Sequence, residues 1–167
     1  CGGGARGAQG RRGKDHGLGA RGAAPPQGEL LELGRLACLA LLSTARIGRV
    51  IYTDAALPAA LPVTYALDDE EVVFRTNGGG RLAAATRNTV VGFQVDELDV
   101  VTGTGWTVLG VGEAYEVIEP GRLAALRERL PQPWVSGHTD HTVCIPLQRL
   151  TGRRIVATDH AGPPPPR

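Results

Sequence analysis

The sequence predicts a mainly β fold (β-rich α+β), a small closed or partly closed β-barrel with peripheral helices. From Gly48 onward, short segments rich in β-branched residues alternate apolar and polar positions with a period of two. Turn residues separate these segments at short intervals, which is typical of antiparallel strands joined by tight turns. The strands do not alternate regularly with helices, so a doubly wound parallel sheet is not expected. Closure of an antiparallel sheet into a barrel removes its free edges.

The expected domain covers residues 29–158 of the 167, between a Gly/Arg-rich tail at 1–28 and a Pro-rich tail at 159–167. The first tail is packed with glycine and basic residues, which predicts disorder. The net charge of +1 suggests no basic face for nucleic acid. No stretch approaches the ~20 apolar residues that cross a bilayer, so no membrane partner is expected. Three widely spaced cysteines fit no disulfide framework and predict a cytoplasmic location.

The first half of the domain is expected to form one helix followed by three strands. Residues 29–43 are rich in Leu and Ala, which predicts the helix, although Gly34 weakens it. Beyond it, the period-two pattern predicts strands at 49–53, 61–67 and 71–76. Pro58 and Pro62 place the second of these strands near a sheet edge or a bulge. Asp68-Asp69 supplies the turn between the second and third strands.

The second half is expected to contain two helices and four strands. The helices are predicted at 80–86 and at 119–130, where Pro120 is suited to the first helical position. The strands are predicted at 89–96, 106–118, 142–147 and 154–157. Within the longest of them, Gly110 and Gly112 mark a bulge, a bend or a close neighbour.

The segment Phe74–Leu82, FRTNGGGRL, has two interpretations. A strand-like triplet runs into Asn77-Gly78, two further glycines and Arg81, just before a short apolar helix. Flexible backbone beside a fixed cation suits the binding of an anion such as a phosphate. However, Asn-Gly is also the strongest short signal for a hairpin turn. These nine residues alone leave both interpretations open.

Other polar clusters predict no catalytic or metal-binding group. The cluster of His138, Asp140, His141 and Cys144 matches no standard zinc spacing, and a solvated loop is the favoured interpretation, so no metal is predicted. Gly103-x-Gly105 opens a strand rather than a helix, which excludes a dinucleotide-binding fingerprint. The catalytic residues stay unknown.

A few aromatic and hydroxyl side chains are further candidates. Trp106 and Trp134 could each flank a flat ligand, although core packing is the default for both in a chain with 4% aromatic residues. Thr64 and Tyr65 place polar tips on a strand that otherwise reads as buried. Such tips either bond to the backbone or point into a pocket.

Five segments taken in order provide a more specific signal: IGRVIYT, LPVTYALDDEEVVFRTNGGGRLAAA, VVGFQVDELD, GWTVLGVGEAYEV and LPQPWVSGHTDHTVCIPLQRLTGRRI. Together they resemble the pyridoxamine 5′-phosphate oxidase-like family of flavin-binding split barrels, and in particular the actinobacterial branch grouped with nitroimidazole-resistance proteins. The resemblance covers residues 30–157. It implies a six-stranded Greek-key split β-barrel that forms a homodimer and holds flavin mononucleotide (FMN) between its subunits.

The resemblance also implies which residues meet the cofactor. Val63, Thr64 and Tyr65 would lie along the edge of the isoalloxazine ring, and Arg75 and Thr76 would approach the ribityl phosphate. Members of the branch usually carry Asn at the position of Thr64, so this chain lacks an amide that could hydrogen-bond near the ring.

Two further groups of residues are implied by the same resemblance. Gly80 and Arg81 would complete the phosphate site, where the branch usually has Lys instead of Arg81, and an arginine can bind phosphate in bidentate fashion. Trp106 and Thr107 lie where the long strand reaches the ring. Two C-terminal positions that approach the cofactor in family members are Trp134 and Arg153.

The implied function is that of a flavin-dependent oxidoreductase acting on a small-molecule substrate, in which the flavin carries the hydride chemistry. C-terminal Arg and His motifs for pyridoxamine phosphate are not found, so activity on that substrate is not expected. A binding protein without turnover would use the same motifs. Some relatives use a deazaflavin cofactor instead of FMN, and others bind haem, for which His138 and His141 are the candidates.

Overall fold

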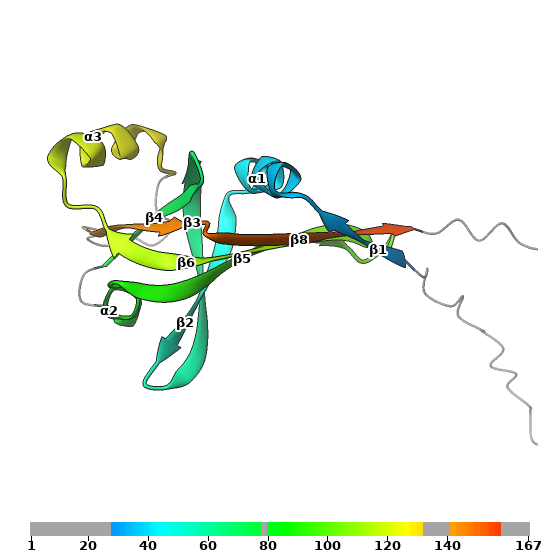
Figure 1. The fold of residues 1–167 in the computed structure, drawn as a ribbon, viewed down its shortest axis with the longest axis horizontal. Helices are drawn as coiled ribbons and strands as arrows, with labels where there is room; N and C mark the ends of the chain where they lie inside the picture. Colours follow the sequence, from blue (N-terminus) through cyan, green and yellow to red (C-terminus); the bar gives the residue numbers. More distant parts are fainter. Residues whose placement is uncertain (1–27, 78–79, 132–140, 158–167) are drawn as a thin grey trace, which may run out of the picture.

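The computed structural model of the chain describes residues 28–77, 80–131 and 141–157. In this part of the chain, eight strands form one antiparallel sheet in the order β1-β8-β6-β5-β2-β3-β4-β7, and β6 also pairs with β7. This additional pairing closes the six strands β2 to β7 into a barrel, which confirms the predicted fold class (Figure 1). The elements in chain order are β1 (Gly28–Leu33), α1 (Arg35–Thr44), β2 (Ile47–Asp54), β3 (Leu57–Asp68), β4 (Glu71–Thr76), α2 (Arg81–Ala85), β5 (Thr89–Asp99), β6 (Thr104–Glu116), α3 (Pro120–Arg129), β7 (His141–Pro146) and β8 (Arg149–Ala157).

The barrel is split because β6 changes partner along its length. Its first part, Gly105–Val111, pairs with β8, whereas Tyr115 and Glu116 pair with β7. Between these parts, a Cβ on Gly112 would lie 1.7 Å from the Pro146 carbonyl oxygen. The sequence left a bulge, a bend or a close neighbour open for this glycine, and the close neighbour is correct. The Pro146 backbone occupies the space that a side chain at this position would need.

β3 changes partner in the same way. Residues Leu57–Thr64 pair with β2, and residues Tyr65–Asp68 pair with β4. Pro58 and Pro62 both lie in the first part, where the strand has a neighbour on one side within the described sheet. This confirms the edge position predicted from the two prolines, since proline cannot donate a hydrogen bond to a second neighbour.

The helix predicted at 29–43 is wrong in its first part. Residues Gly28–Leu33 form β1, whose partner is β8, and α1 begins only at Arg35. Gly34, with an extended backbone (φ −70°, ψ 162°), separates the two elements. The Leu-rich composition favours a helix, but pairing with a strand from the other end of the chain overrides this local preference. For the same reason β8 begins at Arg149, earlier than the predicted strand.

Two apolar clusters stabilise the fold. The larger fills the barrel and the space under α1, and its most buried members include Phe74, Phe93 and Leu42. The smaller lies between α3 and the outward side of β4 and β7, around Val73 and Cys144. α1 and α3 lie on one side of the layer formed by β6 and β8, and α2 lies on the other (Figure 1). No helix in the described residues is long and apolar enough to span a membrane.

Candidate functional site

The outward side of β3 and β4 carries two of the predicted site residues. Thr64 precedes Tyr65 and pairs with Ile47 of β2, and Arg75 follows Phe74, which is the cross-strand partner of Tyr65. The Arg75 guanidinium donates from Nη2 to the Pro131 carbonyl at 3.2 Å. Its Nε is buried and has no hydrogen-bond partner among the described residues. A half-buried arginine with an unused buried donor is a natural partner for an anion.

Other predicted residues on the same strands point into the barrel. Tyr65 is 3% exposed, and its hydroxyl donates to the Leu42 carbonyl at 2.6 Å. Its ring packs edge-on against Phe93, and burial raises the pKa of the hydroxyl above its ordinary value. Val63 packs against the same core, and Thr76 is also buried. These side chains therefore support the strand from within, while the outward face is left to Thr64 and Arg75.

Gly80 and Arg81 lie where β4 passes into α2. Gly80 donates its amide to the Asn77 carbonyl at 3.1 Å and has an extended backbone, and α2 begins at Arg81. The strand β4 is thus followed by a helix and not by the second strand of a hairpin. The Arg81 side chain is 84% exposed, with Nη1 3.3 Å from Oδ2 of Asp54 at the end of β2. An exposed pair of this kind is weakly held, so the guanidinium can exchange its partner for another anion.

Two of the remaining predicted residues lie on another part of the sheet. Thr107 and Arg153 are cross-strand partners on β6 and β8, and both line a groove of about 590 Å³. Trp106 points the opposite way and belongs to the barrel core. The groove lies on the face away from α1, since Gly152, between Thr151 and Arg153, contacts Cys38 of that helix.

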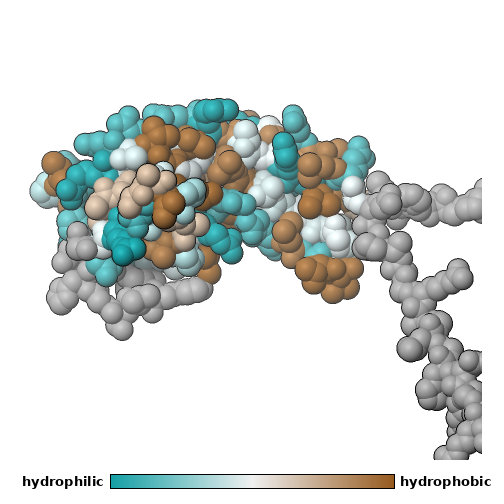
Figure 2. Space-filling model, turned by 90° about the horizontal axis from the view of Figure 1, so that it is seen from below, coloured by the Kyte–Doolittle hydropathy of each residue, from teal (hydrophilic) through white to brown (hydrophobic). Residues whose placement is uncertain are grey.

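The groove also contains residues that the sequence reasoning missed. Gln94 of β5 and Ile51 of β2 line it together with Thr107 and Arg153. The signal for Gln94 was available, because its neighbours Phe93 and Val95 are buried and alternation places a polar residue between them on the opposite face. Figure 2 views the molecule from below, and on this side polar and apolar residues are mixed.

The polar cluster near β7 is only partly described. The His141 ring contacts the Glu116 carboxylate through Nδ1, and Cys144 is fully buried under α3, where burial raises the pKa of its thiol to about 11. His138, Asp140 and Trp134 lie outside the described residues. Within the described ranges, no three His, Cys, Asp or Glu side chains converge on one point.

The sequence model of the family described as pyridoxamine 5′-phosphate oxidase matches residues 34–154, which span the barrel, all three helices and both groups of candidate residues. The chain belongs to this family. An uncharacterized protein of Mycobacterium tuberculosis is 39% identical to it over 145 residues, which cover 83% of this chain and 95% of that protein.

Two solved structures show the same fold. An FAD-binding protein from Mycobacterium smegmatis is 26% identical, with a TM-score of 0.60 over 75% of this chain and 98% of the other. A protein from Corynebacterium glutamicum, described as a pyridoxamine 5′-phosphate oxidase homologue, is 24% identical, with a TM-score of 0.68 over 78% of this chain and 100% of the other. At this identity the second structure supports the fold alone.

Proposed function

We propose that this protein binds a flavin nucleotide, specifically FMN, and acts as a flavin-dependent oxidoreductase on a small molecule. The observation that carries the proposal is the incomplete hydrogen bonding of the Arg75 guanidinium. Its guanidinium is fixed by the Pro131 carbonyl, and its buried Nε has no partner among the described residues. The resemblance implies that the ribityl phosphate of the flavin approaches Arg75, and the similar protein from M. smegmatis is described as binding FAD.

The residues present fit a phosphate group. Arg75 supplies a half-buried guanidinium, and Arg81, which follows Gly80, supplies a second guanidinium that is exposed and only weakly held by Asp54. Charge-assisted hydrogen bonds from arginine to phosphate are among the stronger polar contacts in proteins. Thr64, next to Tyr65 on β3, adds a hydroxyl that can donate or accept a hydrogen bond.

We further propose that two copies of the chain complete the site. The predicted residues that do not belong to the core fall in two places, with Arg75 and Arg81 in the β3–β4–α2 region and Thr107 and Arg153 in the groove. The sheet face around the groove exposes Leu109 and Val90, which a second copy would cover. In a dimer, the groove of one protomer can face the arginines of its partner. The site would then be incomplete in a single chain.

A bound flavin supplies the capacity to accept and donate a hydride. The chain's own residues would bind the phosphate, orient the ring and exclude water from it. We also propose a cytoplasmic location, which the free thiols of Cys38 and Cys144 support.

The test is purification of the full-length protein, followed by denaturation and chromatography of any released pigment. FMN is the expected pigment. Release of FAD or a deazaflavin would replace FMN as the proposed cofactor of the same fold. A colourless protein that takes up no added flavin would remove the proposal.

Reduction of the bound flavin by a nicotinamide donor, and its reoxidation by an acceptor, would distinguish an oxidoreductase from a binding protein without turnover. Light scattering would measure the mass, and we expect that of a dimer.

A further inference from the structure

α3 lies over the outward residues of β4, which are Glu71, Val73 and Arg75. Their neighbours Val72 and Phe74 point into the barrel core, so these three side chains share the opposite face. Each of them contacts α3 or the residues that directly follow it. α3 and the residues that follow it thus contact all three outward side chains of the strand that carries the proposed phosphate-binding arginine.

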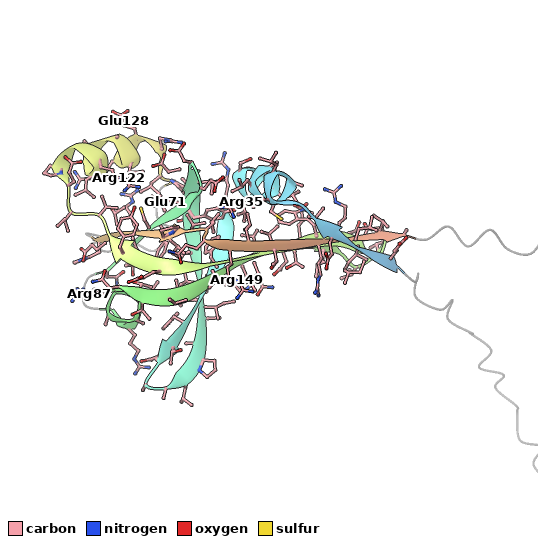
Figure 3. The ribbon with its side chains drawn as sticks, viewed as in Figure 1. Arg35, Glu71, Arg87, Arg122, Glu128 and Arg149 are labelled. Atoms are coloured by element: carbon pink, nitrogen blue, oxygen red, sulfur yellow. The ribbon has the colours of Figure 1, made fainter. Side chains whose placement is uncertain are left out.

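The first end of α3 is held by an ion-paired network. Arg122 pairs with Glu71 and donates from Nη1 to the Tyr115 hydroxyl at 2.7 Å. The Tyr115 hydroxyl in turn donates to the Glu71 carboxylate at 2.8 Å, and the Arg122 guanidinium lies 5.7 Å from the Tyr115 ring centroid. Figure 3 shows Arg122 directed from the helix toward Glu71, whereas Glu128 points away from the sheet.

The second end of α3 leads directly to Arg75. Arg129 pairs with Asp68 at the end of β3, and the buried Leu126 and Leu130 pack in one cluster with Val73. The next residue, Pro131, presents the carbonyl that accepts from Arg75 Nη2 at 3.2 Å. The position of this carbonyl therefore depends on how α3 is docked.

We propose that α3 is a positioning element for Arg75, and that Arg122 and Arg129 are positioning residues for the phosphate of the bound flavin. This inference rests on the proposed function. An arginine side chain has several rotatable bonds, and restricting them at the moment of binding costs free energy. Because the Pro131 carbonyl restricts Arg75 beforehand, the ligand meets a guanidinium that is already oriented.

The test compares two ligands that differ by the phosphate alone. The full-length chain, freed of bound flavin, is titrated with FMN and with riboflavin, and binding is followed by flavin fluorescence. We expect Arg122→Gln and Arg129→Gln to weaken FMN binding about threefold to tenfold, which corresponds to the ordering of one side chain. Their affinity for riboflavin should equal that of the unmodified chain. Arg127→Gln, an exposed residue of the same helix, is the matched control and should change neither affinity.

A double substitution separates positioning from general support of the fold. In an Arg75→Gln background, Arg122→Gln should cause no further loss of FMN affinity, because there is no guanidinium left to orient. If Arg122→Gln does not fold, Arg129→Gln carries the test. It removes only the ion pair with Asp68, in which the arginine is more exposed than Arg122.

Each outcome has a distinct meaning. Equal losses for FMN and riboflavin, or a loss that persists without Arg75, would overturn this inference and leave the proposed function intact. An unmodified chain that binds neither ligand would overturn the proposed function, and this inference with it.

Discussion

The substitution Tyr65→Phe tests whether the outward and inward faces of β3 have the separate roles described above. The resemblance places Tyr65 along the flavin ring, but in the structure its hydroxyl donates to the Leu42 carbonyl at 2.6 Å inside the core. Leu42 lies in the last turn of α1, where carbonyls have no partner within the helix. The hydroxyl therefore joins the barrel to α1, and removing it leaves a buried carbonyl unpaired.

The expected cost of this change is a loss of ~1–2 kcal/mol in the free energy of unfolding. Phenylalanine keeps the ring and its edge-on packing against Phe93, so no large cavity forms. What is lost is one hydrogen bond, with a net contribution of ~1 kcal/mol, together with part of the cost of leaving a buried acceptor unsatisfied. Flavin affinity should not change, because the hydroxyl does not reach the outward face.

The assays are urea unfolding and flavin titration on the same preparations. Tyr52→Phe is the matched control, since Tyr52 is half-buried on β2 and its hydroxyl has no hydrogen bond among the described residues; we expect a change below ~0.5 kcal/mol. The reasoning would be refuted if Tyr65→Phe lowered flavin affinity while the free energy of unfolding stayed the same. That result would mean that the hydroxyl meets the ligand and not Leu42.

Three further predictions concern barrel closure, alkaline stability and the exposed cation. Gly112→Ala should lower the free energy of unfolding by at least ~2 kcal/mol, since its Cβ would meet the Pro146 carbonyl oxygen at 1.7 Å. Gly34→Ala, with open space around it, should cost less than ~1 kcal/mol in the same urea titration, because only a favourable N-cap residue of α1 is lost. Burial raises the pKa of the Cys144 thiol to about 11, so the folded chain keeps a proton that the unfolded chain loses. The free energy of unfolding should therefore fall as the pH rises from about 9 to 11, and Cys144→Ala should make that fall shallower; an unchanged slope would contradict this. Arg81→Glu should weaken FMN binding by at least ~10-fold in a fluorescence titration while Arg81→Lys keeps most of it, and equal affinities would show that Arg81 does not meet the phosphate.

Local patterns in the sequence were sufficient to predict most of the barrel. Period-two alternation marks the strands because each has one side in the core, and Pro58 and Pro62 mark the part of β3 that has one neighbour. β1 could not be found in this way. Its partner β8 lies at the far end of the chain, and nothing in GELLEL itself distinguishes an edge strand from the start of a helix.

The faces on which the candidate residues lie follow from local patterns, but the way the structure groups these residues does not. The glycine-rich segment makes Arg75 and Arg81 candidates for a phosphate site, which stays a prediction. Alternation explains why Tyr65 points inward and its neighbour Thr64 lies on the opposite face. The contact between Arg75 and Pro131 could not be inferred, because it depends on how α3 docks on β4 and not on any local pattern. The groove on the other part of the sheet is likewise a product of strand order, which brings Gln94 beside Thr107 and Arg153.

The absorbance spectrum of the freshly purified full-length protein during gel filtration shows whether the chain carries a flavin as a dimer. We expect flavin absorbance that elutes together with a protein peak of dimeric mass. A colourless peak, unchanged after incubation with FMN, FAD or a deazaflavin, would contradict it.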